Sequence, residues 1–178
     1  MSETAKLKPF IAETQIQTLI DELAEKINHD YAKLATEEKP VLIVVTLKGA
    51  TFFAADLIRK LTIPVQVDFV RLKSYGSGTS SSGEVKLLRK LEASPKGRHL
   101  LILDEIVDSG HSLNFLTNYF EKQNPATLKI CTLLNKPSRR QVEVHVDYIG
   151  SDVKDEFLVG YGLDHDEKYR NLKEIYYI

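Results

Sequence analysis

The stretch that decides the fold runs from Leu100 to Leu113 and reads LLILDEIVDSGHSL. An apolar run of strand length ends in Asp104 and Glu105, and Asp108 then opens a Gly- and Ser-containing turn before a segment with helical spacing. Acids at the carboxyl end of a buried strand are where an open α/β sheet places ligand-binding groups. A Gly- and Ser-rich turn before a helix offers free N–H groups and a positive dipole end to a phosphate. The combination predicts a site for ribose phosphate chemistry.

Apolar strands and amphipathic helices alternate on both sides of this stretch. The spacing of apolar residues predicts helices over Thr14–Leu34, Phe52–Leu61 and Ser112–Lys122. Strands are expected at Val41–Leu47, Val65–Leu72, Glu84–Leu88, His99–Leu103, Leu128–Leu134, Val144–Ile149 and Phe157–Val159. This alternation predicts an α/β fold in one domain over residues 1–178, with a mainly parallel, twisted sheet flanked by helices.

Composition sets the bounds on function. The chain is 43% hydrophobic and 28% charged, with a formal net charge of −1, so bulk electrostatics do not favour nucleic acid as a partner. The single cysteine, Cys131, lies in an apolar run, which predicts a buried thiol and suits a reducing compartment. The first residues lack the apolar core of a signal peptide, and no apolar stretch reaches the roughly 18 residues of a membrane span. A cytoplasmic protein without membrane contact is expected.

Chemically useful residues follow four of the predicted strands. Lys48-Gly49 follows the first strand, Ser74-Tyr75-Gly76 the second, Asp104-Glu105 the third and Asn135-Lys136 the fourth. The carboxyl ends of parallel strands share one edge of the sheet, where ligands bind. Each lysine taken alone is more simply explained as a solvated loop charge. Their convergence on one edge is what predicts an active site there.

Other familiar signatures do not fit. The run Tyr75–Ser81 approaches a dinucleotide-binding fingerprint, but Ser81 stands where the third glycine is needed and a strand rather than a helix follows. A Gly-x-x-x-x-Gly-Lys-Ser/Thr loop is absent from the sequence, and the five histidines lack metal-ligand spacing. The polar loop Ser74–Gly83 has two readings, a loose connection or a lid that excludes water from a reactive intermediate.

Several motifs occur in an order that resembles a known family. Beside the acidic motif, they are Leu47-Lys48-Gly49, Lys73-Ser74-Tyr75-Gly76, Lys136-Pro137-Ser138-Arg139-Arg140, Asp147-Tyr148-Ile149-Gly150, Asp155–Asp164 and Glu167–Leu172. Together they closely resemble the hypoxanthine-guanine phosphoribosyltransferases of purine salvage, within the type I phosphoribosyltransferases. The resemblance runs from about Val41 to the C-terminus. It implies the type I fold with a small hood built from the chain termini.

The resemblance implies roles for the acidic motif and the loop after it. Asp104 and Glu105 would hold the ribose 2′- and 3′-hydroxyls, directly or through Mg²⁺-bound water. The 5′-phosphate would lie in the loop formed by Asp108, Ser109, Gly110, His111 and Ser112. The Asp108 side chain would face N7 of the purine as general base or acid. The implied reaction is Mg²⁺-dependent transfer of the phosphoribosyl group from phosphoribosyl pyrophosphate to hypoxanthine or guanine, giving IMP or GMP and pyrophosphate.

The remaining implied roles concern purine, pyrophosphate and metal. Lys136 would donate to the 6-oxo group, Phe157 would stack on the ring and the Leu158 backbone would meet its exocyclic edge. Pyrophosphate would be held by Arg170 and by the Lys48 backbone beside Gly49, and Mg²⁺ by Asp104, Glu105 and Asp164. The resemblance also implies a cis Leu47–Lys48 peptide bond and a lid that includes Ser74 and Tyr75. A homodimer or homotetramer is implied, with Arg71 or Lys73 near a subunit contact.

Two departures and two alternatives accompany the resemblance. The family's usual acidic order is Glu-Asp, whereas this chain has Asp104-Glu105, and Ser109 and Ser112 stand at usual threonine positions. One alternative is an enzyme for another 6-oxopurine, such as xanthine. The other is a non-catalytic sensor of phosphoribosyl pyrophosphate that binds RNA or DNA, which the near-zero net charge disfavours. Arg139 and Arg140 have no assigned role in the site and are expected to contact carboxylates or a neighbouring subunit.

Overall fold

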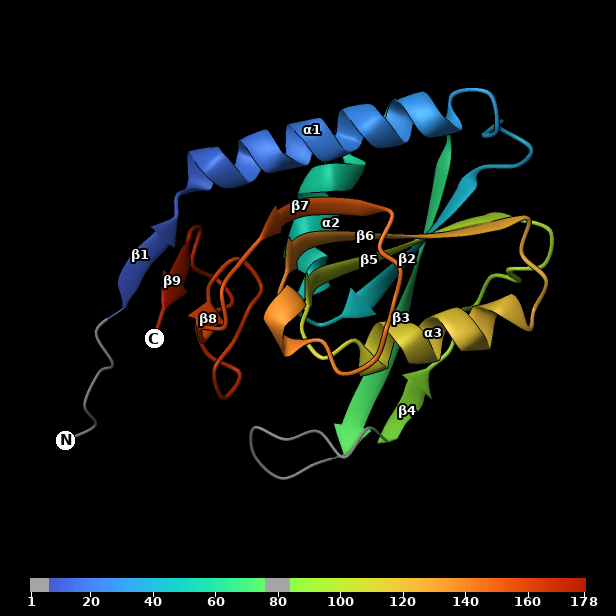
Figure 1. Cartoon of the computed structure of the whole chain (residues 1–178). Helices are drawn as coiled ribbons and strands as arrows, with labels where there is room; N and C mark the ends of the chain where they lie inside the picture. The colour runs from blue at the N-terminus through green and yellow to red at the C-terminus, as the bar shows by residue number, and fades with distance from the viewer. Residues whose placement is uncertain (1–6, 76–83) are drawn as a thin grey trace.

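The computed structural model describes residues 7–75 and 84–178, and its centre is a six-stranded sheet in the order β4-β3-β2-β5-β6-β7 (Figure 1). These strands are β2 (Val41–Leu47), β3 (Val65–Tyr75), β4 (Glu84–Arg89), β5 (His99–Val107), β6 (Thr127–Asn135) and β7 (Tyr148–Asp152). All neighbouring pairs are parallel except β3 and β4. The predicted mainly parallel sheet is confirmed.

Helices cover both faces of this sheet, which explains the unbroken apolar runs in its central strands. The helices α1 (Glu13–Tyr31) and α2 (Ala50–Ile58) lie on one face, and α3 (His111–Glu121) lies on the other (Figure 1). In β2, Val41, Ile43 and Val45 pack into the core on the α1 and α2 side, whereas Leu42 and Val44 pack into the core on the α3 side. A strand buried on both faces needs apolar side chains at every position.

The chain termini form a hood beside the carboxyl edge of the sheet. A three-stranded antiparallel sheet joins β1 (Lys8–Ile11), β9 (Ile175–Tyr177) and β8 (Leu158–Val159) in that order (Figure 1). Phe10 lies against Tyr177 with ring centroids 4.3 Å apart, which packs the two ends of the chain together. The hood is confirmed, although β1 and β9 are too short to stand out as strands in the sequence.

The strand that carries the acidic motif is longer than predicted. β5 continues from His99 to Val107, because β6 pairs with it as far as Val107 opposite Asn135. Asp104 and Glu105 therefore lie within the strand rather than after it. The two carboxylates lie close together at this end of β5, because the side chain of each acts on the pKa of the other.

Other predicted elements are present with shifted ends. β3 extends to Tyr75 because β4 pairs with its last residues in antiparallel register. The expected strand Val144–Ile149 is wrong in position, since β7 lies at Tyr148–Asp152, while Val144 and Val146 pack against the core on the α3 side. Phe157 precedes β8 and is half exposed rather than part of a core strand. The three predicted helices are confirmed within a few residues.

Further expectations concern Cys131, the peptide before Lys48 and the membrane. Cys131 is buried, and burial raises the pKa of its thiol. The Leu47–Lys48 peptide is cis, as predicted. Within the described part of the chain, none of the helices combines the length and apolarity needed to cross a membrane.

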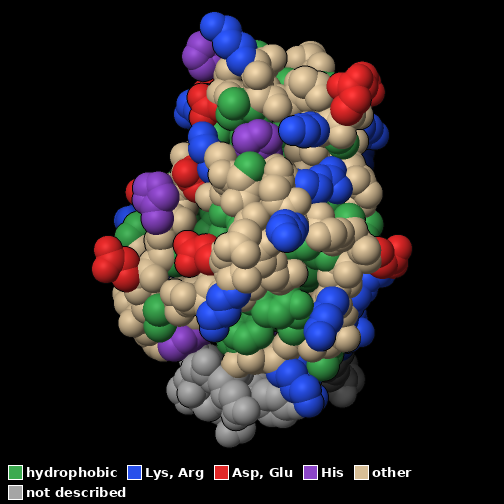
Figure 2. All heavy atoms as spheres, turned by 90° about the vertical axis from the view of Figure 1, so that its right-hand side faces the viewer, with side chains coloured by type: hydrophobic (Ala, Val, Ile, Leu, Met, Phe, Trp, Pro, Cys, Tyr) green, Lys and Arg blue, Asp and Glu red, His purple; other side chains and the backbone are tan. Residues whose placement is uncertain are grey.

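Figure 2 looks onto the end of the molecule where the parallel strands begin, and acidic and basic side chains are interspersed on this face.

The two neighbouring phenylalanines of α2 provide a test of the core. Phe53 is fully buried, whereas Phe52 is 40% exposed. We expect Phe53→Ala to lower the free energy of unfolding by about 3–5 kcal/mol, because it leaves a cavity between α2 and the sheet. Phe52→Ala should lower it by no more than about 1.5 kcal/mol, since less apolar area is lost. Urea denaturation followed by circular dichroism measures both. Equal losses would contradict this assignment of the core.

Candidate active site

A phosphate-sized cavity lies at the turn from β5 into α3. It has a volume of about 220 Å³ and is lined by Asp104–Gly110, Ser112 and Leu113. His111, predicted to bind the phosphate, lies outside this lining, with its Nε2 3.2 Å from Gln141 Oε1. Gly110 has φ 90° at the N-terminus of α3, and a Cβ atom there would come within 2.5 Å of the Val142 carbonyl oxygen, so the position requires glycine. The Ser109 carbonyl accepts the N–H groups of Gln141 and Val142, which fixes the loop from outside. The cavity is thus at a helix N-terminus, where anions bind.

The two acids of β5 have different surroundings. The buried Thr46 hydroxyl lies 2.7 Å from Asp104 Oδ1, which also accepts the Glu105 N–H. Glu105 Oε1 lies only 2.0 Å from where a Cβ atom on Gly49 would stand. Burial and the neighbouring Asp104 charge raise the pKa of Glu105 well above its ordinary value. Excess negative charge at this position favours a cation or hydroxyl donors as the ligand.

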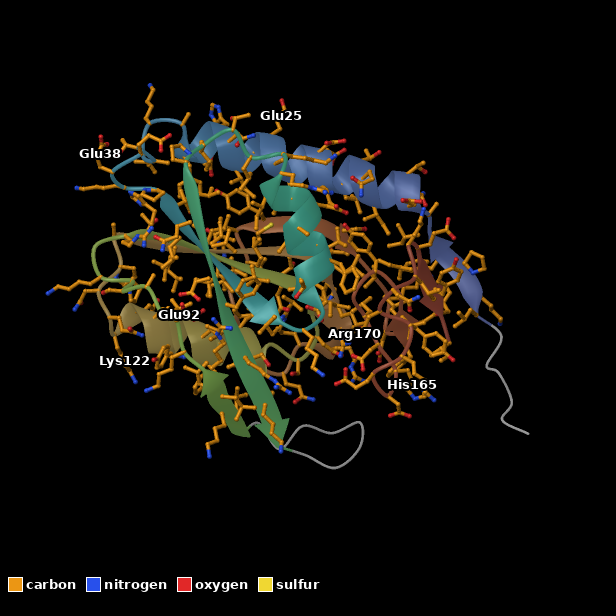
Figure 3. All side chains as sticks on the ribbon, turned by 180° about the vertical axis from the view of Figure 1, so that it is seen from behind. Glu25, Glu38, Glu92, Lys122, His165 and Arg170 are labelled. Carbon is orange, nitrogen blue, oxygen red and sulfur yellow. The ribbon has the colours of Figure 1, made fainter. Side chains whose placement is uncertain are left out.

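The hood brings Arg170 to the carboxyl edge of the sheet, beside the two acids of β5. Arg170 Nη1 donates to the Gly162 carbonyl at 2.8 Å, and Nη2 lies 2.8 Å from Asp164 Oδ1. Figure 3 shows Arg170 and His165 on the hood side, far from Glu38 and Lys122 at the other end of the molecule. Gly162, whose carbonyl accepts from Arg170, lies against Gly49 in the turn between β2 and α2, since a Cβ atom on Gly162 would come within 2.2 Å of the Gly49 carbonyl oxygen.

The predicted metal ligands do not form one cluster. Asp164 is engaged by Arg170, while Asp104 and Glu105 lie together on β5. Within residues 7–75 and 84–178, no group of three Asp, Glu, His or Cys side chains is arranged to hold a metal ion. A pair of carboxylates fits a Mg²⁺ ion that takes its other ligands from water and from substrate phosphates.

A larger cavity of about 700 Å³ opens between the ends of β5 and β6 and the hood. Lys136 lies in its wall and is buried, with Nζ donating to the Glu156 carbonyl at 2.7 Å. Phe157 and Leu158 line it from the hood, and the Phe157 ring meets His165 edge-on with centroids 5.3 Å apart. A cavity with an aromatic ring and one buried cation suits a flat heterocycle with an acceptor atom.

Asp108 lines both cavities, and its partner is a residue that the sequence analysis left unassigned. Arg139, at the end of the 3₁₀ helix η1 (Pro137–Arg139), donates from Nε to Asp108 Oδ1 at 3.0 Å and lies 3.6 Å from Asp155 Oδ1. Arg140 donates instead to Asn135 Oδ1. Arg139 thus orients Asp108, and its place just after the end of β6 is the sequence signal that could have identified it.

Thr46 is a second residue that sequence reasoning missed. It precedes Leu47 at the end of β2 and shares a sheet face with Asp104, so strand alternation could have indicated the contact. The predicted lid over residues 74–83 lies mostly outside the described residues. Ser74 and Tyr75 end β3, and Gly76–Gly83 lie outside the described residues.

Comparison with known proteins agrees with this arrangement. The family model of the phosphoribosyl transferase domain matches residues 12–166. A hypoxanthine-guanine phosphoribosyltransferase of Mycobacterium tuberculosis is 43% identical, over 97% of this chain and 89% of its own length.

Solved structures extend the likeness to the fold. A hypoxanthine-guanine phosphoribosyltransferase from Bacillus anthracis has a TM-score of 0.88 at 41% identity, covering 97% of this chain and 99% of the other. A hypoxanthine phosphoribosyl transferase from Trypanosoma cruzi has a TM-score of 0.92 at 36% identity, covering 100% of this chain and 94% of the other. The fold is therefore that of a type I phosphoribosyltransferase, and the chain belongs to the hypoxanthine-guanine phosphoribosyltransferases.

Proposed function

We propose that this protein transfers the 5-phosphoribosyl group from phosphoribosyl pyrophosphate to hypoxanthine or guanine, releasing pyrophosphate and forming IMP or GMP. The observation that carries the proposal is the position of Asp108 in the walls of both cavities. One cavity has the size and helix N-terminus for a 5′-phosphate, and the other has the size and lining for a purine. The proposed reaction joins the ribose of one ligand to the ring of the other, beside this carboxylate.

In the proposed reaction the bond from C1 of the ribose to pyrophosphate breaks and a bond from C1 to N9 of the purine forms. The purine must also lose a proton, and in this proposal Asp108 accepts it from N7. Arg139 holds one oxygen of Asp108, which leaves the other oxygen for this transfer. The Asp104 and Glu105 carboxylates orient the ribose hydroxyls, while Arg170, Lys48 and Gly49 accept the leaving pyrophosphate.

Lys136 supports a preference for 6-oxopurines. In the part of the chain that the structure describes, its buried ammonium has one hydrogen-bond partner, the Glu156 carbonyl, and therefore has donors left for a ligand. A 6-oxo group supplies an acceptor for these remaining donors, whereas the 6-amino group of adenine presents another donor and leaves them without an acceptor.

Mg²⁺ is part of the proposal as the metal held by Asp104 and Glu105, with Asp164 near the pyrophosphate. The raised pKa of Glu105, caused by burial and the charge of Asp104, supports a cation at this pair. When bound, the ion would neutralise charge on the pyrophosphate as it leaves.

The proposed assembly is a homodimer or homotetramer. The first half of β3 is an unpaired sheet edge, because β4 pairs with β3 only from Arg71 onward. Val67, on this part of β3, is 39% exposed. An unpaired edge with exposed apolar side chains is suited to contact with another chain.

The proposed function is tested by pyrophosphate release from phosphoribosyl pyrophosphate and Mg²⁺ with hypoxanthine, guanine, xanthine or adenine. We expect turnover with hypoxanthine and guanine. Asp108→Asn should lower kcat by about 10²–10⁴-fold, because general base catalysis is lost. Asp21→Asn, which removes an exposed carboxylate on α1, should leave turnover unchanged. Turnover of xanthine alone, or of no purine at all, would contradict the proposal.

Lys136→Met tests base selection. We expect kcat/KM for hypoxanthine to fall about 10- to 100-fold, because a hydrogen bond to a charged donor is lost. The ratio of kcat/KM for hypoxanthine to that for adenine should fall as well. Lys154→Met, at an exposed lysine of the same region, is the matched control and should leave both values unchanged. An unaltered ratio in Lys136→Met would show that another group selects the base.

Chelation tests the metal. Excess EDTA should abolish turnover, and added Mg²⁺ should restore it, because the ion is needed to neutralise the pyrophosphate charge. Without phosphoribosyl pyrophosphate, EDTA should leave the melting temperature unchanged, since the described residues form no three-ligand metal cluster. Full turnover in EDTA would contradict the proposed role of Mg²⁺.

A further inference from the structure

A tight hairpin in the hood lies over the proposed pyrophosphate site. His165 and Lys168 exchange backbone hydrogen bonds, and the two residues between them, Asp166 and Glu167, have φ values of 51° and 62°. Two central residues in the left-handed region are what a type I′ turn requires, and glycine or asparagine is favoured there. A strained turn built from two acidic residues indicates a functional reason for its shape.

The turn directs Glu167 at two cations. Glu167 Oε1 lies 2.9 Å from Lys48 Nζ, and Glu167 Oε2 lies 3.2 Å from Arg170 Nη2. Each oxygen of one carboxylate therefore contacts a different positive group. Arg170 and the Lys48–Gly49 turn are the groups that the proposed function assigns to pyrophosphate. An anion of the protein thus sits where an anionic leaving group is expected.

Glu167 is not needed to hold Arg170 in place. Arg170 already donates to the Gly162 carbonyl and pairs with Asp164, each at 2.8 Å. Lys48 differs, because among the described residues Glu167 is the only acidic side chain within salt-bridge distance of its ammonium. The Glu167 side chain is 62% exposed, so it can turn into solvent when another anion arrives.

We propose that Glu167 is an affinity-determining residue for pyrophosphate, an internal anion that occupies Lys48 and Arg170 in the free enzyme and is displaced by the diphosphate of substrate or product. This inference rests on the proposed function, because that function places pyrophosphate at these residues. Displacing an existing ion pair makes diphosphate binding weaker than binding to bare cations. The expected benefit to the reaction is faster release of pyrophosphate.

The test compares Glu167→Gln with Asp166→Asn. Both remove one charge and keep side-chain shape on the same turn, but among the described residues the one ion pair of Asp166 is with His165, at 3.9 Å. Pyrophosphate binding in the presence of Mg²⁺ is measured by titration calorimetry. Glu167→Gln should lower Kd about two- to tenfold, as expected from removing two exposed ion pairs. The gain should shrink at high salt, which screens such contacts. Asp166→Asn should change Kd by less than about twofold.

A second variant and a turnover assay distinguish failure of this inference from failure of the proposed function. Glu167→Ala should show the same gain, which a misfolded protein could not produce. An equal gain in Asp166→Asn, or unchanged or weaker binding in both Glu167 variants, would overturn the inference. Purine turnover by the wild type is measured separately. If the wild type turns over purines and the Glu167 variants bind no tighter, only the inference fails. If it binds pyrophosphate without turnover, the proposed function fails.

Discussion

The site depends on the close approach of two glycines. Gly162 in the hood has φ 96°, and a Cβ atom there would lie 2.2 Å from the Gly49 carbonyl oxygen. A Cβ atom on Gly49 would in turn meet the Glu105 carboxylate. The hood, the β2–α2 turn and the acidic strand β5 thus meet where neither glycine position has room for a side chain. Without this contact Arg170 would not reach the edge of the sheet that carries the acids.

The reversed acidic pair fits this geometry in terms of side-chain length. Asp104 is short and is met by Thr46, whose hydroxyl comes from the neighbouring strand to within 2.7 Å. Glu105 is longer and extends across the face of the sheet toward Gly49. Thr46 thus stabilises the carboxylate that is one methylene shorter than the family's usual glutamate. The order Asp-Glu is accommodated by the Thr46 hydroxyl on β2 and by the lack of a side chain at Gly49, where the Glu105 carboxylate lies instead.

Much of the fold could be predicted because the spacing of apolar residues along the sequence indicates which side chains are buried. β2, with apolar residues on both faces, and α1, with one apolar stripe, both follow their sequence patterns closely. The position of β7 could not be predicted in this way. Val144 and Val146 have the right composition for a strand, but the first backbone hydrogen bond to β6 comes from Asp147 and ladder pairing begins at Tyr148. Strand pairing depends on both partner segments, so the apolar pattern of one segment cannot predict where its pairing begins.

The site shows the same division. The loop after Asp108 could be predicted, because strand, turn and helix are consecutive in the sequence. The contacts of Arg139 could not, because Asp108 and Asp155 are joined to it only by the fold. The roles taken from the family resemblance remain predictions, and the structure adds which of those residues lie together.

Internal ion pairs give the site its charge balance before any substrate binds. Arg139 lies between two carboxylates, and Arg170 pairs with Asp164 and Glu167. Phosphoribosyl pyrophosphate carries several negative charges, so the proposed binding exchanges internal anions for external ones rather than filling a bare cationic pocket. Such an exchange reduces net affinity but preserves selectivity. Only a ligand that pairs with all of the released cations at once makes up for the loss of the internal carboxylates that it displaces. A near-neutral chain can in this way bind a highly charged substrate and still release a charged product.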